Sequence, residues 1–184
     1  VIGIAIVLVD ARPQHDQCTN VRPLQTQPLP PVSIGQTVSW QEHSKNDLRA
    51  WPQLLRKGGR NFKIDPNYLH ASACAKQTRA RQDLRGCFVL NHDTPDGTRD
   101  DYNTTGDVLR FMEGTQYRRY FSRPGEPFIV ALCFKSAPAL CGSSTESQHW
   151  RALVDELFEA AQQTLARATL NVQFVLDGDA IGGA

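Results

Sequence analysis

The stretch Phe128-Ile129-Val130-Ala131-Leu132-Cys133-Phe134 is a continuous apolar run, and Lys135 follows it directly. A short run of this kind is typical of a buried strand. The same pattern, an apolar run that ends in ionisable residues, recurs elsewhere along the chain. The other runs lie at residues 37–40, before Glu42 and His43; at 61–64, before Asp65; at 87–91, before His92 and Asp93; and at 172–176, before Asp177 and Asp179.

Segments with helical character separate most of these runs. Residues 48–55 follow a candidate cap at Asp47, residues 106–113 follow a candidate cap at Thr105, and residues 147–168 carry an apolar residue at every third or fourth position. Residues 67–85 show no such stripe, so we expect a small excursion there, closed by a disulfide between Cys74 and Cys87.

Alternating strands and helices predict an α/β fold with parallel strands and right-handed crossovers. Ionisable groups collected at the carboxyl ends of the strands are typical of a TIM-type (β/α) barrel enzyme. A complete barrel needs about 250 residues. We therefore predict a partial barrel of about five parallel strands with intervening helices. An open doubly wound sheet, which also binds ligands at its strand ends, is the alternative.

Composition divides the chain into three parts. Residues 1–9 are an apolar run too short to span a bilayer, and residues 1–11 are predicted to be the tail of a secretory signal, with a first buried strand as the alternative. Residues 12–35 are predicted to form a proline-rich leader, and residues 36–184 are expected to be the N-terminal part of the barrel. Lys plus Arg number 20 against 19 Asp plus Glu, so nucleic acid is not an expected partner.

The five cysteines fit a secreted or extracellular protein. None of them forms a CxxC motif, so a zinc ribbon is not expected. Local disulfides are expected for Cys74 with Cys87 and for Cys133 with Cys141, leaving Cys18 over; burial of several as small apolar residues is the alternative. The triplet beginning at Asn103 matches a glycosylation sequon.

Three motifs carry a resemblance to a known family when they are taken in order. They are Glu42-His43-Ser44-Lys45-Asn46-Asp47, then Gly58-Gly59-Arg60-Asn61-Phe62-Lys63-Ile64-Asp65, then Val89-Leu90-Asn91-His92-Asp93. Together they resemble the opening of the glycerophosphodiester phosphodiesterase family, one of the phospholipase C-like phosphodiesterase barrels. The resemblance covers residues 38–135 and implies that His43 and His92 are catalytic. Imidazole suits acid–base cleavage of a phosphodiester near neutral pH.

The sequence departs from the family at the cation site. The family holds a divalent cation with the two acids of Glu-x-Asp and a later glutamate, but Lys63 and Cys133 occupy two of these three positions, and Asp65 alone remains. We therefore expect no required cofactor, or a weakly held Mg²⁺ or Ca²⁺ with Asp65 as a ligand. If no metal is held, Asp65 is expected to orient one of the two imidazoles. Lys63 and Lys135 are expected to contact phosphate instead, because a side-chain cation also stabilises transition-state charge. An ion pair of Lys63 with Asp65 or Asp177 is the structural alternative.

The sequence thus predicts a phosphoric diester hydrolase acting on glycerophosphodiesters or phospholipid headgroups by His-His acid–base catalysis. Glu42, Asp93, Asp177 and Asp179 are expected to line the site. The expected partner is a phosphodiester small molecule or a lipid headgroup, with peripheral contact to a membrane. A catalytically degenerate barrel that serves as a secreted or cell-surface binding module is the alternative, because two family carboxylates are missing.

Overall fold

The computed structural model describes residues 41–42, 45–80, 83–93, 95, 99–125, 127–135 and 144–176. The predicted signal tail at 1–11, the leader at 12–35 and the run at 37–40 lie outside these residues.

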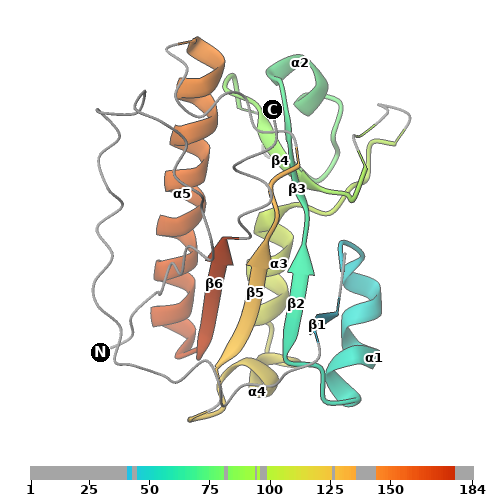
Figure 1. Ribbon diagram of the computed structural model, residues 1–184, viewed down its shortest axis with the longest axis vertical. Helices are drawn as coiled ribbons and strands as arrows, with labels where there is room; N and C mark the ends of the chain where they lie inside the picture. Colours follow the sequence, from blue (N-terminus) through green and yellow to red (C-terminus); the bar gives the residue numbers. More distant parts are fainter. Residues whose placement is uncertain are drawn as a thin grey trace, which may run out of the picture.

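The central element is a parallel sheet with the order β1-β2-β5-β6 (Figure 1). Its strands are the two-residue β1 (Gln41–Glu42) and the longer β2 (Asn61–Ile64), β5 (Phe128–Leu132) and β6 (Val172–Leu176). The register aligns Lys63 with Ala131, and Ala131 with Val175. The predicted α/β class and the parallel pairing of these runs are confirmed, although the described residues form no closed barrel.

The run at 87–91 is not a strand of the parallel sheet, so that part of the prediction is wrong. It forms β4 (Cys87–Leu90), which pairs antiparallel with β3 (Pro66–Leu69) in a separate sheet. In Figure 1 this pair lies beyond the carboxyl ends of β2 and β5. Proline is tolerated as the first residue of a strand, so Pro66 begins β3 instead of ending the extended segment.

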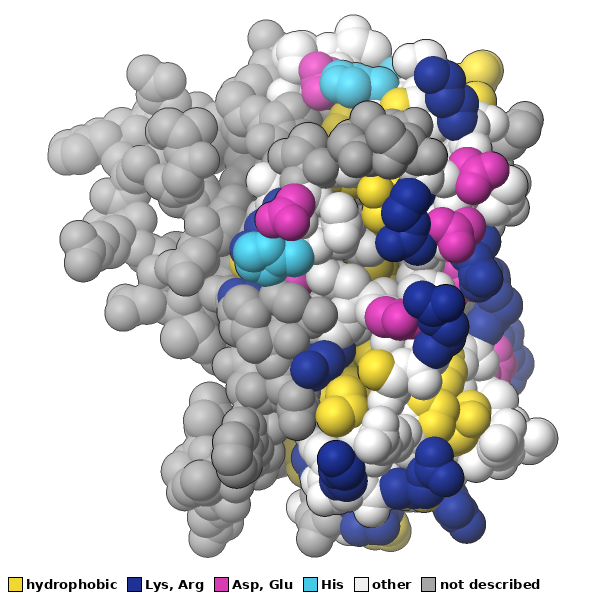
Figure 2. Space-filling model, turned by 90° about the vertical axis from the view of Figure 1, so that its right-hand side faces the viewer, with side chains coloured by type: hydrophobic (Ala, Val, Ile, Leu, Met, Phe, Trp, Pro, Cys, Tyr) yellow, Lys and Arg dark blue, Asp and Glu magenta, His cyan; other side chains and the backbone are white. Residues whose placement is uncertain are grey.

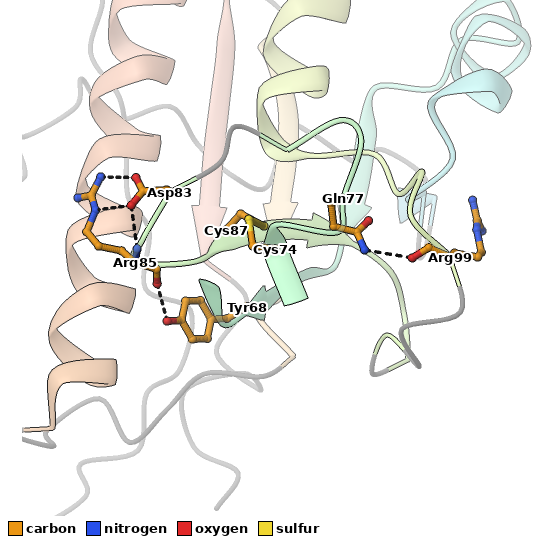
Figure 3. Close-up of a disulfide and its surroundings, with 7 residues drawn as sticks. All are labelled: Tyr68, Cys74, Gln77, Asp83, Arg85, Cys87 and Arg99. Carbon is orange, nitrogen blue, oxygen red and sulfur yellow. Dashed lines mark hydrogen bonds and ion pairs between the residues drawn. A yellow bond between two sulfur atoms is a disulfide. The ribbon is translucent and has the colours of Figure 1, made fainter. Parts of the chain in front are cut away.

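The antiparallel pair is the expected excursion, and its disulfide is present. The bond joins Cys74, the last residue of the short helix α2 (Ala71–Cys74), to Cys87 at the start of β4, with 5.7 Å between the Cα atoms (Figure 3). Both cysteines belong to a small core of their own with Val89 and Tyr102. Cys133 is a buried free thiol, so its predicted pairing is wrong.

The two faces of the parallel sheet differ in character. Phe62, Ile64, Val130 and Leu132 point into the main hydrophobic core. Because successive side chains of a strand point to opposite faces, Lys63 lies on the other face, and so does Asp65 if the alternation continues past the end of β2. The sheet therefore has one apolar face under its helices and one face that carries ionisable groups.

The helices on the apolar side start close to where the sequence predicts. The long helix α5 (Thr145–Ala168) is capped by Ser144, and α3 (Thr105–Glu113) is capped by Thr104 through a capping box with Asp107. The predicted starts at 147 and 106 were thus one or two residues late, because the capping side chain precedes the apolar stripe. In Figure 1, α3 lies behind the sheet and α5 beside β6.

Shorter helices complete the apolar side. The predicted segment 48–55 splits into a 3₁₀ turn, η2 (Leu48–Ala50), capped by Asp47, and α1 (Trp51–Arg56), which accommodates Pro52 in its first turn. Helix α4 (Arg118–Phe121) precedes β5. Edge-to-face aromatic contacts join these helices to the sheet, with ring centroids 4.8 Å apart for Trp51 and Phe62 and 4.7 Å apart for Phe121 and Phe128. Each such pair contributes about 0.5–1.5 kcal/mol beyond its area burial.

Candidate functional site

Asp65 is the centre of a polar cluster at the carboxyl end of the parallel sheet. It follows β2 directly and is fully buried. Asn46 binds it twice: its amide nitrogen donates to Oδ2 at 2.9 Å, and its amide oxygen accepts from the Asp65 backbone N–H at 2.8 Å. Such two-point contact fixes the carboxylate in one orientation.

Lys135 is the cationic partner of this carboxylate. Its Nζ lies 3.5 Å from Asp65 Oδ1, and its backbone N–H donates to the Pro66 carbonyl at 3.0 Å. Oδ1 has no hydrogen-bond partner among the described residues, so its contact with Nζ is an electrostatic one at the limit of hydrogen-bond length. The Lys135 side chain keeps 29% of its surface exposed, which leaves the ammonium group accessible to an anion.

The surroundings of Lys135 favour its charged form. Burial by itself lowers the pKa of Lys135, but the hydrogen bond to the Cys133 sulfur and the charges of Cys133 and Asp65 outweigh burial and raise that pKa above its ordinary value. The ammonium group is therefore protonated throughout the neutral range. Lys135 is thus a permanent positive charge at the end of the sheet.

Lys63 lies two residues before Asp65 in β2. Its side chain is buried, with 7% of the residue exposed, and it stands in register with Ala131 of β5. The Lys63 carbonyl accepts the backbone N–H of Lys45 at 2.7 Å, which connects β2 to the segment that carries Asn46. The ion-pair partner observed for Asp65 is Lys135, the other lysine that the sequence assigns to phosphate.

His92 and Asp93 lie on the loop after β4. The imidazole Nδ1 is 3.0 Å from Asp93 Oδ1, and both side chains are largely exposed, at 54% and 88%. The preceding residue, Asn91, donates its backbone N–H to the Asp65 carbonyl at 3.1 Å. The antiparallel insertion therefore brings the His92 loop alongside the polar cluster, although β4 does not belong to the parallel sheet.

Four asparagines of this region were not predicted as site residues. Besides the Asn46 amide, the Asn67 amide donates to the Asn91 carbonyl at 2.6 Å, the Asn91 amide donates to the Asp93 carbonyl at 3.0 Å, and the Asn103 amide donates to the Asn46 carbonyl at 2.9 Å. Asn103, the first residue of the sequon, thus ties the start of α3 to the cluster. Asn91 directly follows β4, which is a signal that the sequence offered, whereas Asn67 lies within β3 and Asn103 lies just before α3.

Several predicted residues cannot be compared with this geometry. His43, Asp177 and Asp179 lie outside the described residues, and so does the side chain of Glu42. Of the predicted site residues that the structure describes, it brings together Asp65 and Lys135, and it places the His92 loop beside them. The expectation that Asp65 orients an imidazole has no counterpart among the described residues, where its partners are an amide and an ammonium group.

The described side chains do not fit a calcium or magnesium site. Hard cations take six or more oxygen ligands, and here the carboxylate of Asp65 is faced by the Lys135 ammonium group on one oxygen and by the Asn46 amide on the other. Within the described part of the chain, no three His, Cys, Asp or Glu side chains are close enough together to hold a metal ion.

One face of the molecule mixes charges of both signs. Figure 2 shows Lys and Arg side chains spread over one face, with acidic and apolar side chains between them. A cavity of about 230 Å³ lies apart from the polar cluster, lined by residues such as Phe88, Gly106 and Leu157. None of the helices that the structure describes has the length and apolarity to cross a bilayer.

Comparison with known proteins adds no assignment, because no family model, curated protein or solved structure matches this chain.

Proposed function

We propose that the chain is a phosphoric diester hydrolase acting on glycerophosphodiesters or phospholipid headgroups. The observation that carries the proposal is the accessible ammonium group of Lys135, held by the buried Asp65 carboxylate at the carboxyl end of a parallel sheet, with the His92–Asp93 pair on the adjoining loop. A fixed cation and an imidazole on an adjoining loop together offer what phosphodiester cleavage requires, which is stabilisation of anionic charge and a group that exchanges protons.

The strand order supports a piece of a TIM-type barrel over a doubly wound sheet. The order β1-β2-β5-β6 follows the chain without a reversal. A doubly wound sheet reverses its order at the point where it binds ligands, and it carries helices on both faces. A sheet that grows in one direction, with ionisable residues just past the carboxyl ends of its strands, fits an arc of a barrel.

In this proposal each described residue has a defined role. Lys135 binds a phosphate oxygen, and Asp65 holds Lys135 in place instead of orienting an imidazole. His92 exchanges a proton through Nε2, because Nδ1 is turned to Asp93, which orients the ring. Lys63 adds a second positive charge, and His43 supplies the second imidazole of the acid–base pair.

The same arrangement supports catalysis without a resident metal, since lysine cations can supply the charge that a divalent ion supplies elsewhere. The disulfide between Cys74 and Cys87 supports a secreted or extracellular location, because structural disulfides persist in oxidising compartments. A lipid headgroup substrate would bring the protein into peripheral contact with a membrane surface.

The second candidate is a degenerate barrel that binds a phosphodiester without cleaving it. The absence of a metal-binding cluster among the described residues favours it, because the family that the sequence resembles uses a divalent cation. Under this reading Lys135 and Asp65 bind the ligand, and His92 is an exposed surface residue.

The two candidates are separated by turnover of a soluble diester. The purified protein is incubated with glycerophosphocholine, and released choline is measured, with a phosphomonoester as the control for contaminating phosphatase. We expect His92→Ala to lower kcat by about 10²-fold or more. The matched control is His70→Ala, since His70 is also exposed and lies 3.4 Å from an acid, Glu146, outside the cluster.

Retained turnover in His92→Ala contradicts the catalytic role. Absence of turnover with glycerophosphodiesters and phospholipid vesicles, together with binding of glycerophosphocholine that depends on Lys135, establishes the binding module. If the protein neither cleaves nor binds these diesters, both candidates are contradicted.

A further inference from the structure

Asn67 is buried in the antiparallel insertion, yet its side chain reaches the loop that carries His92. The residue has no exposed surface. Its amide nitrogen donates to the Asn91 carbonyl at 2.6 Å and lies 3.4 Å from the Asp93 carbonyl. These are the carbonyls of the residues immediately before and after His92, so one amide group spans the histidine.

Two further hydrogen bonds also hold this loop in place. The Asn91 amide donates to the Asp93 carbonyl at 3.0 Å, and the Asn91 backbone N–H donates to the Asp65 carbonyl at 3.1 Å. The loop is therefore fixed to itself, to β3 and to Asp65, the residue that follows β2. Such anchoring is more than an exposed surface residue needs, since loops at the surface are ordinarily free to move.

Asn67 makes these contacts at an energetic cost. Its carbonyl oxygen Oδ1 is buried and accepts no hydrogen bond from the residues that the structure describes. A buried acceptor without a donor is destabilising, and an apolar residue of similar size would avoid the penalty. Local choices that lower stability are expected where a site has to be held in one geometry. The orphaned oxygen thus marks Asn67 as a residue kept for its donor group.

We infer that Asn67 is a positioning residue for His92, with Asn91 as its partner. Asn67 sets the place of the peptide groups on both sides of the histidine, and the imidazole is then aimed by Asp93 and by the position of its own backbone. The inference rests on the proposed function, because the position of His92 matters for turnover only where His92 exchanges a proton with substrate.

Gln77 supplies a matched control. It is a second buried amide of the same insertion, with one hydrogen bond to a loop carbonyl, that of Arg99 at 3.0 Å, and with an orphaned oxygen (Figure 3). It differs from Asn67 in that it does not contact the carbonyls beside His92. A loss of stability alone should appear in both Asn67→Ala and Gln77→Ala, whereas an effect on His92 should appear in Asn67→Ala only.

The test measures turnover of glycerophosphocholine and the NMR signals of the His92 ring, assigned by comparison with His92→Ala. For Asn67→Ala we expect kcat to fall by about tenfold or more with KM within about twofold, and the His92 ring signals to shift. Gln77→Ala should leave both unchanged. The double variant Asn67→Ala/His92→Ala should be no slower than His92→Ala, because the two residues act through one group.

Several results would overturn the inference: unchanged ring signals in Asn67→Ala, equal shifts in Gln77→Ala, or a loss of kcat that matches the unfolded fraction. If Asn67→Ala does not fold, Asn91→Ala removes the second clamp from a partly exposed position and is judged by the same measurements. If the unmodified protein shows no turnover, the proposed function fails, while the ring signals still decide whether Asn67 positions His92.

Discussion

Lys135 Nζ lies 3.5 Å from Oδ1 of Asp65, so one ion pair joins the carboxyl ends of β5 and β2. The carboxylate is fully buried and the lysine is partly exposed, so the loss of one partner should have a different effect on stability from the loss of the other. Loss of the lysine leaves a buried charge with the Asn46 amide as its remaining side-chain partner, whereas loss of the carboxylate leaves an ammonium group that water can reach.

We expect Lys135→Met to lower the free energy of unfolding by about 1–3 kcal/mol, less than for a fully buried pair because Lys135 is partly exposed. Adding Asp65→Asn should recover part of that loss, since the uncompensated charge is then removed. Urea unfolding of the two single variants and the double variant measures the coupling. Additive effects would show that the two side chains do not interact.

The contacts of Lys135 with the Cys133 sulfur and with Asp65 predict a pH dependence of stability. The folded state raises the pKa of Lys135, so the folded protein holds this proton more tightly than the unfolded chain. The resulting stabilisation is complete below the unfolded value of about 10.4 and is lost as pH rises through the folded pKa. The unfolding free energies of the unmodified protein and Lys135→Met should therefore converge above about pH 10.5. A constant difference across this range would contradict the assignment.

Lys63 tests whether lysine charge replaces a metal. We expect turnover to persist in a strong chelator, and Lys63→Met to lower kcat by about 10²-fold. Lys57→Met, at an exposed lysine after α1, is the control. Lys63→Glu should not be rescued by Mg²⁺ or Ca²⁺ unless Cys133→Glu is made as well. Chelator-sensitive turnover in the unmodified protein would refute the replacement of a metal by lysine.

Gly86 begins the return into β4 with a φ of +107°, and a Cβ there would lie 2.2 Å from the Leu69 carbonyl oxygen. Gly86→Ala should therefore lower the unfolding free energy by about 2–4 kcal/mol through strain and displacement of the paired strand. Gly125→Ala is the control, because φ is +76° but no atom lies within 4 Å; we expect a loss of about 1 kcal/mol. Thermal unfolding of both variants measures the difference. Equal losses would mean that the close approach to Leu69 is not what requires glycine.

The disulfide closes a loop with a sequence separation of 13. Its loss in Cys74→Ser/Cys87→Ser should lower the unfolding free energy by about 3 kcal/mol, since the crosslink limits the unfolded chain. A reductant should shift the urea midpoint of the unmodified protein towards that of the variant and leave the variant unchanged. A midpoint that does not respond to reductant would show that the bond contributes no stability.

The sequence predicted the type of each element whose hydrophobic pattern fits one kind of secondary structure. Helix α5 carries a long stripe, and β5 and β6 are apolar runs with clear ends, so their types were predictable. Strand β4 was assigned to the wrong sheet because all of its residues are buried, and a run without alternation does not distinguish parallel from antiparallel pairing. Strand β3 was not predicted, because residues 67–85 show no periodic pattern and were expected to form a small excursion.

The residues of the polar cluster also include some that the sequence predicted and some that it did not. Asp65 and Lys135 were predictable because parallel strands deliver their carboxyl ends to one edge. The asparagines were not, because Asn46 meets Asp65 across 19 residues, and Asn103 meets Asn46 across 57. Contacts of that range depend on the turn geometry between the elements, which no local pattern encodes.

Strand β4 begins at the disulfide and ends two residues before His92. A strand of four residues spans about 13 Å. The covalent crosslink therefore lies at one end of this short strand, and the loop that carries the imidazole follows its other end. A reducing environment therefore removes the crosslink at one end of the strand, while Phe88 and Leu90 of β4 still belong to the main hydrophobic core. Protein prepared under reducing conditions would then be folded by most spectroscopic criteria and still be impaired in turnover. The oxidation state of the sample therefore has to be controlled when turnover is measured.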